Sequence, residues 1–307
     1  MSQTSLNQSD FEPIEIKSSE AEKIAGESTS YWKDAWRRFR KNKLAMASIV
    51  VIIFLAIMAA LGTVLSGQNY YDNDLINANK PMSGEHWFGT DNLGRDLFTR
   101  TWYGARISLF IGLAAAFIDL VVGVIWGSIS GYIGGKVDEY MMRIADILTG
   151  LPYLLVVVLL TVILPKGLFS IILAMTITGW INMARIVRGE VFRLKTQEYV
   201  LAAKSLGSNT LRIMWKHLIP NMLGPIIVTL TLTVPTAIFT EAFLSFLGLG
   251  VPQPQASWGT MTSDALDSLR YYPYQLFFPA FFICLTMLAF NVIGDGLRDA
   301  LDPKDRR

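Results

Sequence analysis

The stretch from Leu44 to Leu65 constrains this chain more than any other, because its 22 residues are mostly apolar and include no charged side chain. A helix of that length rises about 33 Å, which is enough to cross the hydrocarbon core of a bilayer. The composition agrees with lipid as the solvent, since 52% of all residues are apolar and only 17% are charged. The stretch therefore predicts a membrane-spanning helix, preceded by the basic residues Arg37, Arg38, Arg40, Lys41 and Lys43.

Five further stretches have the length and apolar content of membrane spans. We therefore expect an all-α integral membrane protein with six transmembrane helices, located in the cell membrane as a multi-pass protein. The further spans are expected at about 107–131, 147–164, 168–184, 222–247 and 276–293.

The placement of Lys and Arg in the connecting segments predicts the orientation. If the N-terminus is inside, the segments 31–43, 132–146, 185–221 and 294–307 are cytoplasmic, and they hold 19 basic residues against six in the outside segments. Cytoplasmic loops of membrane proteins carry such an excess of positive charge. The topology is therefore expected to be N-in and C-in.

Residues 1–30 are rich in Ser, Glu, Asp and Gln and contain no apolar run. Such a segment buries too little apolar surface to offset its ordering entropy, so it is expected to be a disordered cytoplasmic tail. The chain as a whole is nearly balanced, with 27 basic and 25 acidic residues. Phosphate binding needs a basic excess on one face, so no nucleic-acid partner is expected.

The inside segment 185–221 is too long for a simple turn. Within it, residues 198–221 predict two short helices that meet at Gly207, because glycine tolerates the left-handed conformation that ends a helix. Ser208 or Asn209 can cap the second helix, and Pro220 marks a break before the fifth span.

The first of these short helices has the side chains of a docking surface. Ala202 and Ala203 present no bulk, so another surface can approach the backbone closely, and apolar side chains lie beside Lys204. The alternative is an amphipathic helix that lies on the lipid surface.

The spacing of Ala202, Ala203, Gly207 and Pro220 resembles the "EAA" loop of binding-protein-dependent ABC importer permeases. Leu201 stands where the glutamate of that motif is expected, and Glu198 lies three residues earlier as a substitute. The resemblance implies a coupling helix that sits in a groove of a cytoplasmic ATPase. Its candidate residues are Glu198, Tyr199, Leu201, Ala202, Ala203, Lys204, Gly207 and Pro220.

Three other motifs resemble the oligopeptide, dipeptide and nickel branch of these permeases. They are HWFGTDNLGRDLFTRTWYGARISL at 86–109, GLGVPQPQASWGTM at 248–261 and GDGLRDALDP at 294–303. The likeness is to the OppC or DppC type of subunit from Gram-positive bacteria and covers about 31–307. It implies a type I ABC importer permease fold. The implied divisions are an OppC-like N-terminal region at 31–103, a transporter domain at 104–294 and a cytoplasmic C-terminal tail at 295–307.

The outside motif places charges of alternating sign near the membrane surface, with two glycines at expected turns. We expect a salt-bridged cap on the second span, and the alternative is direct contact with the substrate or with its delivery protein. The residues concerned are Gly89, Thr90, Asp91, Gly94, Arg95 and Asp96.

Small and polar residues inside the spans suggest how the helices meet. Gly123, Gly127 and Gly131 stand four apart, which favours a packing stripe rather than a pore lining. An ionisable group inside a membrane should face protein or water and have a partner. The candidates for pore or interhelical contacts are Asp119, Asn182, Glu241 and Asn291.

No motif in the chain supports catalysis. The sequence around Gly135-Lys136 lacks a phosphate-binding loop, because Ser130 replaces its first glycine and Val137 follows the lysine. No metal or nucleophile motif is present. The chain is therefore expected to be no enzyme and to bind no metal or cofactor itself, with ATP and Mg held by partner ATPase subunits.

The resemblance implies a permease subunit of an ATP-driven, binding-protein-dependent oligopeptide importer. Its partners would be a second, OppB-like permease, two OppD/OppF-like ATPases, an extracellular lipid-anchored peptide-binding protein and the peptide cargo. Alternatives are a dipeptide or nickel importer subunit of the same family. A self-sufficient secondary transporter belongs to a different class, and the paired intramembrane ions and matching broken helices typical of that class are not evident.

Overall fold

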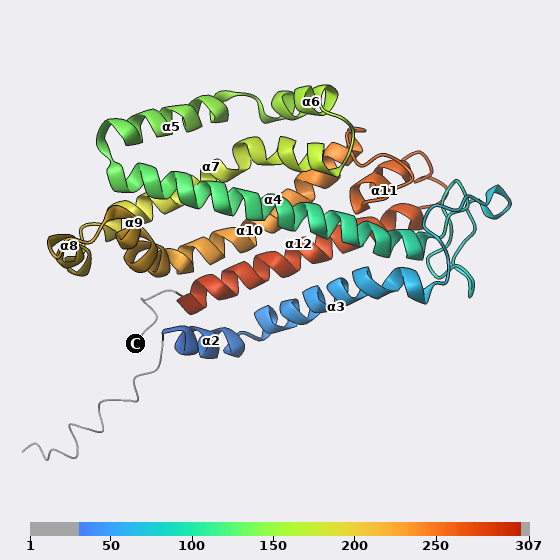
Figure 1. The fold of residues 1–307 in the computed structure, drawn as a ribbon. Coiled ribbons are helices and arrows are strands. Elements are labelled where there is room, and N and C mark those ends of the chain that lie inside the picture. The colour runs from blue at the N-terminus through green and yellow to red at the C-terminus, as the bar shows by residue number, and fades with distance from the viewer. Residues whose placement is uncertain (1–30, 302–307) are drawn as a thin grey trace, which may run out of the picture.

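The computed structural model describes residues 31–301, and the regular structure within that range is helical (Figure 1). One isolated antiparallel bridge joins Thr90 and Asp96. The predicted tail 1–30 and residues 302–307 lie outside the described residues.

The described chain runs through short and long helices in alternation. The long ones are α3 (Lys43–Leu65), α4 (Leu97–Ile133), α7 (Leu168–Leu194), α10 (Ile219–Phe246) and α12 (Tyr274–Leu301). The shorter segments are α2 (Tyr31–Lys41), the 3₁₀ turn η2 (Leu75–Asn77), α5 (Gly135–Gly150), α6 (Tyr153–Ile163), α8 (Glu198–Ser205), α9 (Thr210–Ile213), the π-helical η3 (Met214–Leu218) and α11 (Trp258–Asp264).

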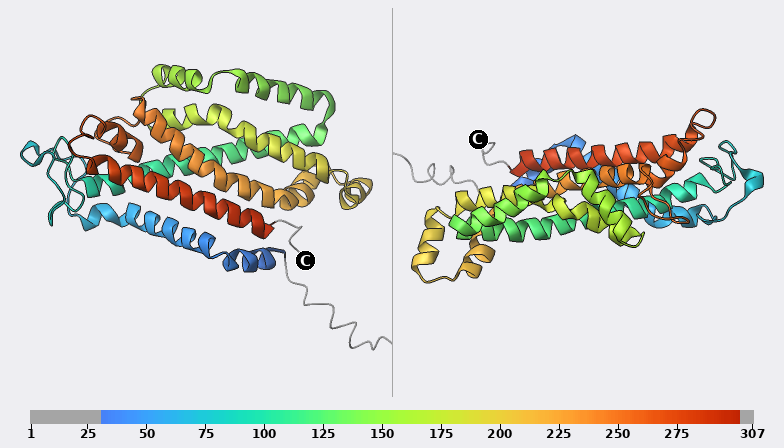
Figure 2. Two further views of the ribbon diagram at one scale, coloured as in Figure 1. Left: turned by 180° about the vertical axis from the view of Figure 1, so that it is seen from behind. Right: turned by 90° about the horizontal axis from the view of Figure 1, so that it is seen from above.

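The long helices lie side by side in one bundle (Figure 1). At one end are α2, the α8–α9 segment and the C-terminal end of α12, and at the other end are the 66–96 segment and α11 (Figures 1 and 2). The segments predicted to be cytoplasmic thus share one end. Within residues 31–301, five helices are long and apolar enough to cross a membrane, and six spans result if the bent pair α5–α6 counts as one.

The third predicted span, 147–164, is bent rather than one continuous helix. The chain breaks at Leu151 and Pro152, and α5 and α6 meet there at 83°. Proline disfavours the helical conformation in the residue before it, and Leu151 accordingly has φ −77° and ψ 134°. The third span is therefore a bent pair, in which an amphipathic helix is followed by a short apolar one.

Several other helices extend beyond the expected spans. Helix α4 begins at Leu97 rather than near 107, and α7 continues to Leu194, so the inside segment expected at 185–221 starts as helix. Residues 295–301, expected as part of a C-terminal tail, continue α12. Hydropathy detects only the part of a helix that lies in hydrocarbon, whereas backbone hydrogen bonding continues into the polar region.

The glycine stripe of α4 packs directly against α7, as the sequence predicts. A Cβ atom at any of the three positions would approach an α7 side chain too closely for an ordinary contact. A Cβ atom added at Gly123, Gly127 or Gly131 would lie 2.6, 2.9 or 2.9 Å from the Cβ atom of Met183, Val187 or Val191, respectively. Small residues let two backbones approach in lipid, where packing rather than water exclusion drives association.

Helix α3 lies at the edge of the bundle and α7 at its centre. Only 17% of the most apolar window of α3 is buried, against 61% for α7. The contact of α3 with α4 is nevertheless specific, because Gly62 makes room for Trp102: a Cβ atom at Gly62 would lie only 2.6 Å from the Cβ of Trp102. Arg106 of α4 also donates to the carbonyl of Ala60 at 2.8 Å and to the hydroxyl of Thr63 at 2.6 Å.

We predict that Gly127→Leu destabilises the bundle by about 1–3 kcal/mol, because the added side chain overfills the α4–α7 contact. The measurement is unfolding of the detergent-solubilised chain in a denaturing surfactant. The matched control is Gly189→Leu on α7, where a built Cβ meets nothing within 4 Å. Equal stability of the two variants would contradict the close contact of α4 with α7.

Candidate functional site

The segment between α7 and α10 forms a helical hairpin at the cytoplasmic end. Helix α8 ends at Ser205, and Gly207, two residues further on, has φ +79° and donates its N–H to the carbonyl of Lys204. The N–H of Ser208 bonds to the carbonyl of Ala203 at 3.1 Å, so the end of α8 is a glycine-dependent cap. Of the two capping residues the sequence allows, Asn209 caps α9, since its side chain accepts the N–H of Arg212 at 2.8 Å.

One face of this hairpin is anchored in the bundle. Val200 is buried and packs in a cluster with Ile213 and Leu218 against residues of α7, including Val187 and Val191. The hairpin is therefore attached to both α7 and α10 by a continuous apolar contact.

The opposite face is exposed and unusually apolar. Leu206 is 88% exposed and Leu201 is 51% exposed. Ala202, Lys204 and Glu198 also lie at the surface. Figure 2 shows the hairpin projecting beyond the ends of the long helices. Further exposed apolar side chains on or beside it are Tyr199, Leu211 and Trp215. Exposed apolar side chains rimmed by polar ones are typical of a protein docking surface.

Pro220 does not break the chain, in contrast to the prediction. It lies in the first turn of α10, directly after the π-helical segment η3. The π-helical segment η3 joins α9 to α10, so residues 210–246 form one helical path. The fifth span is thus connected to the hairpin without an intervening loop.

At the opposite end, the motif around Asp91 folds into a buried ionic network. The Asp91 carboxylate accepts the N–H of Leu93 and of Arg95 at 2.9 Å, and Arg95 Nε lies 2.7 Å from its other oxygen. Arg100 Nε lies 3.5 Å from the same carboxylate oxygen. Asp264, from α11, lies 3.7 and 3.8 Å from the two guanidinium groups and completes the cluster.

Asp264 is the member of this network that the sequence did not single out. Burial raises the pKa of its carboxyl above the usual range, although Arg100 and Arg95 oppose the shift. It lies more than 150 positions from Asp91 in the chain, and no local pattern connects the two. The network therefore fixes α11 to the start of α4.

The remaining residues of the motif shape the turn that precedes α4. Gly89 and Gly94 have φ of +81° and +76°, and a Cβ at Gly94 would clash with the carbonyl of Asp74. Thr90 accepts the N–H of Lys80 at 2.8 Å. Asp96 is the N-cap of α4 and accepts the N–H of Thr99 at 2.8 Å. Ion pairs of Asp91 with Arg95 and Arg100 and the cap from Asp96 thus lie together at the start of α4.

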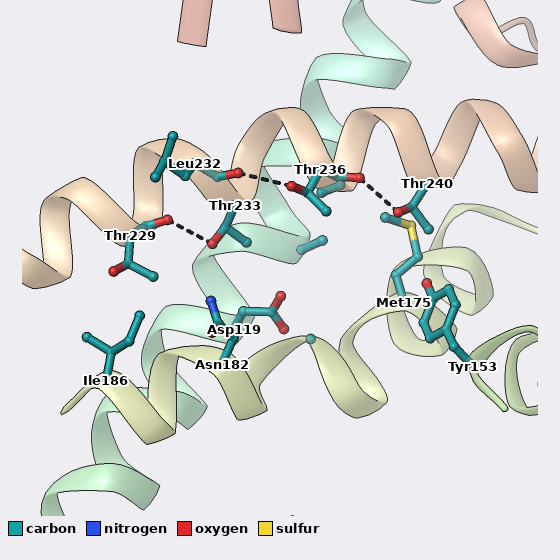
Figure 3. A pocket seen from close by; sticks show the side chains of 13 residues that line it. Asp119, Tyr153, Met175, Asn182, Ile186, Thr229, Leu232, Thr233, Thr236 and Thr240 are labelled. Carbon is teal, nitrogen blue, oxygen red and sulfur yellow. Dashed lines mark hydrogen bonds between the residues drawn. The ribbon is translucent and has the colours of Figure 1, made fainter. Parts of the chain in front are cut away.

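A cavity of about 520 Å³ lies in the middle of the bundle between α4, α6, α7 and α10. Asp119 of α4 and Asn182 of α7 line it, and Figure 3 shows both side chains beside the ribbon of α7. Thr229, Thr233, Thr236 and Thr240 line the wall formed by α10. No sequence motif singled out these threonines, although their spacing of four, three and four residues marks one face of a helix.

The central cavity continues toward the cytoplasmic end. A second cavity of about 1020 Å³ shares Ile186, Thr229 and Leu232 with it. This second cavity extends to Tyr199 of α8 and to Arg298 near the end of α12. Together the two cavities form a path along α7 and α10 from mid-bundle to the base of the hairpin.

Glu241 does not line this path. Glu241 is 1% exposed. Its carboxylate accepts hydrogen bonds from three serine hydroxyls: from Ser108 at 3.1 Å, from Ser245 at 2.8 Å and from Ser257 at 2.6 Å. Ser108 in turn accepts the N–H of Trp258 at 3.1 Å. Of its two expected roles, Glu241 has the interhelical one, joining α4, α10 and the start of α11.

Asn291 lies on an exposed face of α12 and does not line the central cavity. The structure thus brings Asp119 and Asn182 together and separates Glu241 and Asn291 from them. Among residues 31–301, no group of three or more His, Cys, Asp or Glu side chains is arranged to hold a metal ion.

Comparisons with known proteins agree with this architecture. Residues 123–307 match the family described as the binding-protein-dependent transport system inner membrane component. Residues 30–81 match the N-terminal TM domain of oligopeptide transport permease C. Among solved structures, an inward-facing form of the MetNI methionine ABC transporter superposes with a TM-score of 0.55 at 17% identity, covering 65% of this chain and 94% of that one.

Curated relatives are much closer in sequence. The oligopeptide transport system permease protein OppC of Bacillus subtilis is 65% identical, with 97% of each chain covered. The dipeptide permease protein DppC of the same organism is 59% identical over 95% of this chain and 91% of that one. OppC of Escherichia coli is 46% identical over 93% and 95%. This chain therefore belongs to the binding-protein-dependent transport system inner membrane components, as an OppC-type peptide permease of the type I fold.

Proposed function

We propose that this chain forms one half of the membrane path of an oligopeptide importer and transmits ATPase motion to that path. Its partners are a second, OppB-like permease, two OppD/OppF-like ATPase subunits and an extracellular, lipid-anchored peptide-binding protein. The observation that carries the proposal is the exposed apolar hairpin α8–α9, which is joined to α7 and α10, two of the four helices that line the central cavity.

The connections of the hairpin support a mechanical role. Helix α7 leads into α8, and α9 continues through η3 into α10. Val200 and Ile213 pack into the cluster that holds α7 against α10. A displacement of the hairpin therefore moves α7 and α10 together, and with them the two cavity walls that these helices form. Sliding or tilting of packed helices is a usual means of switching access.

The chain supplies no chemistry of its own in this scheme. It acts as a non-enzymatic membrane subunit, and ATP and Mg bind to the partner ATPases. The exposed hairpin residues Glu198, Tyr199, Leu201, Ala202 and Lys204 make the contact with the ATPase surface, whereas the predicted Ala203 is buried within the chain.

The names of the relatives support a peptide cargo. The oligopeptide relative is somewhat more similar than the dipeptide relative, at 65% against 59% identity. A dipeptide importer is the second candidate, supported by the same comparison. Uptake of a labelled pentapeptide by the assembled transporter, with unlabelled dipeptide as competitor, distinguishes the two. Dominant competition by the dipeptide would overturn the oligopeptide assignment.

We predict that Gly207→Val abolishes peptide uptake and leaves membrane insertion intact. A β-branched residue at φ +79° strains the backbone by more than about 1–2 kcal/mol and displaces the end of α8. The measurement is ATP-driven uptake together with the amount of chain in the membrane. The matched control is Gly207→Asn, because asparagine tolerates the left-handed conformation and should retain most uptake. Normal uptake by the valine variant would contradict the coupling role.

We also predict that Leu206→Asp lowers the amount of ATPase that co-purifies with the membrane subunits by roughly tenfold, the loss expected when a contact of about 1.4 kcal/mol is removed. Because Leu206 is 88% exposed, the substitution should leave the fold unchanged. Leu206→Met keeps an apolar side chain and serves as the control. If the aspartate variant retains the ATPase in full, this face of the hairpin is not the docking surface.

A further inference from the structure

Asp119 has a buried carboxylate without a partner. The residue is 6% exposed, and its Oδ1 atom is buried with no hydrogen-bond partner. Among residues 31–301, neither the hydrogen bonds nor the ion pairs include Asp119. Glu241, by contrast, is held by three serine hydroxyls. An ionisable group at membrane depth is costly unless it meets a partner, so Asp119 is placed to interact with a ligand from outside the described residues.

The surrounding backbone is built to accommodate this carboxylate. Gly179 of α7 lies against it, and a Cβ at that position would approach Oδ1 to 2.7 Å. Both residues line the central cavity, and Figure 3 shows the carboxylate between α7 and α10. No Lys, Arg or His is among the described residues that line this cavity. No basic side chain of this lining therefore neutralises the Asp119 carboxylate.

The threonine wall opposite Asp119 offers acceptors. The hydroxyl of Thr233 donates to the carbonyl of Thr229 at 2.9 Å, and Thr229, Thr236 and Thr240 likewise each donate to the carbonyl four residues earlier. Because each hydroxyl hydrogen is used within α10, the oxygen lone pairs are what remain for a ligand in the cavity. Apart from the amide of Asn182 and the hydroxyl of Tyr153, the polar side-chain groups of the lining are acceptors. Such a lining suits a ligand that is cationic and rich in N–H donors.

We propose that Asp119, with the threonine face of α10, forms a transient binding site for the ammonium groups of the cargo peptide. The ammonium comes either from the α-amino terminus or from a lysine side chain, which share the same chemistry. This inference rests on the proposed function, since it takes a peptide as the cargo. Asp119 offsets the cost of desolvating the ammonium group in mid-membrane and so favours cationic over neutral cargo.

The first test is ATP-driven uptake by the complete transporter in proteoliposomes. The cargoes are three alanine-based peptides: one with a free α-amino group, one acetylated, and one acetylated but bearing a lysine. Removing one charge partner from a largely desolvated site should slow uptake of amino-bearing peptides roughly tenfold in Asp119→Asn. Uptake of the acetylated, lysine-free peptide should not change. The peptide that is slowed identifies the source of the ammonium group.

Two variants separate charge from structure in this test. The double variant Asp119→Asn with Asn182→Asp returns one carboxylate to the same cavity, and it should restore uptake of the amino-bearing peptides. The matched control Glu139→Gln removes an exposed carboxylate of α5 outside the cavity and should leave every rate unchanged. If Asp119→Asn takes up each of the three peptides as fast as the wild type does, the proposal is overturned. So does an equal loss for all three that the double variant fails to restore.

The second test reads the site without transport. A water-soluble carbodiimide couples a carboxylate to a primary amine in contact with it and so forms an amide bond. The carbodiimide takes up the water that is lost and becomes a urea. Treatment of the complete transporter with each peptide should give an amide at Asp119 with amino-bearing peptides only, detected by mass spectrometry. An amide between Asp119 and a lysine of the second permease subunit overturns the proposal, because the charge then has a permanent partner.

The two tests also separate this site from the proposed function. If wild type takes up none of the peptides but couples an amino-bearing peptide at Asp119, the ammonium site stands and the importer assignment falls. If uptake is normal, coupling fails and Asp119→Asn behaves as wild type, the importer assignment stands and the site falls.

Discussion

The close contact of α4 with α7 is the interaction on which the rest of the structure depends. Gly123, Gly127 and Gly131 allow the two backbones to meet, and α7 thereby becomes the most buried of the candidate spans. In lipid no water exclusion drives helices together, so close packing of small residues has to supply the attraction. The cavity and the hairpin both lie on elements that this contact positions.

Polar groups inside the bundle follow two different patterns. Asp91 and Glu241 are surrounded by donors from the same chain and act as fastenings between segments. Asp119 is also buried, but no such donor is found for it among residues 31–301. A protein in a low-dielectric solvent satisfies the groups that hold it together, so an unsatisfied group on a cavity wall stands out as a site for a visiting ligand.

The spans and the hairpin were predictable because they depend on local signals. Hydropathy identifies a helix such as α3 from its own residues, and the end of α8 follows from a glycine that alone adopts φ +79° without strain. Boundaries were less predictable: α4 starts at Leu97 because Asp96 caps it, within a motif that hydropathy treats as loop. The bend at Pro152 was missed because the residues on both sides are apolar.

The sequence by itself determined the number and orientation of the membrane segments, the packing stripe on α4 and the family of the chain. These depend on composition, on spacing within one helix and on motifs that are read along the chain. Only the tertiary structure decided which polar residues meet: Glu241 with three serines, Asp91 with a network that includes Asp264, and Asp119 with an open cavity. The physical reason is that a buried charge is stabilised by neighbours distant in sequence, and no local pattern records which helix supplies them.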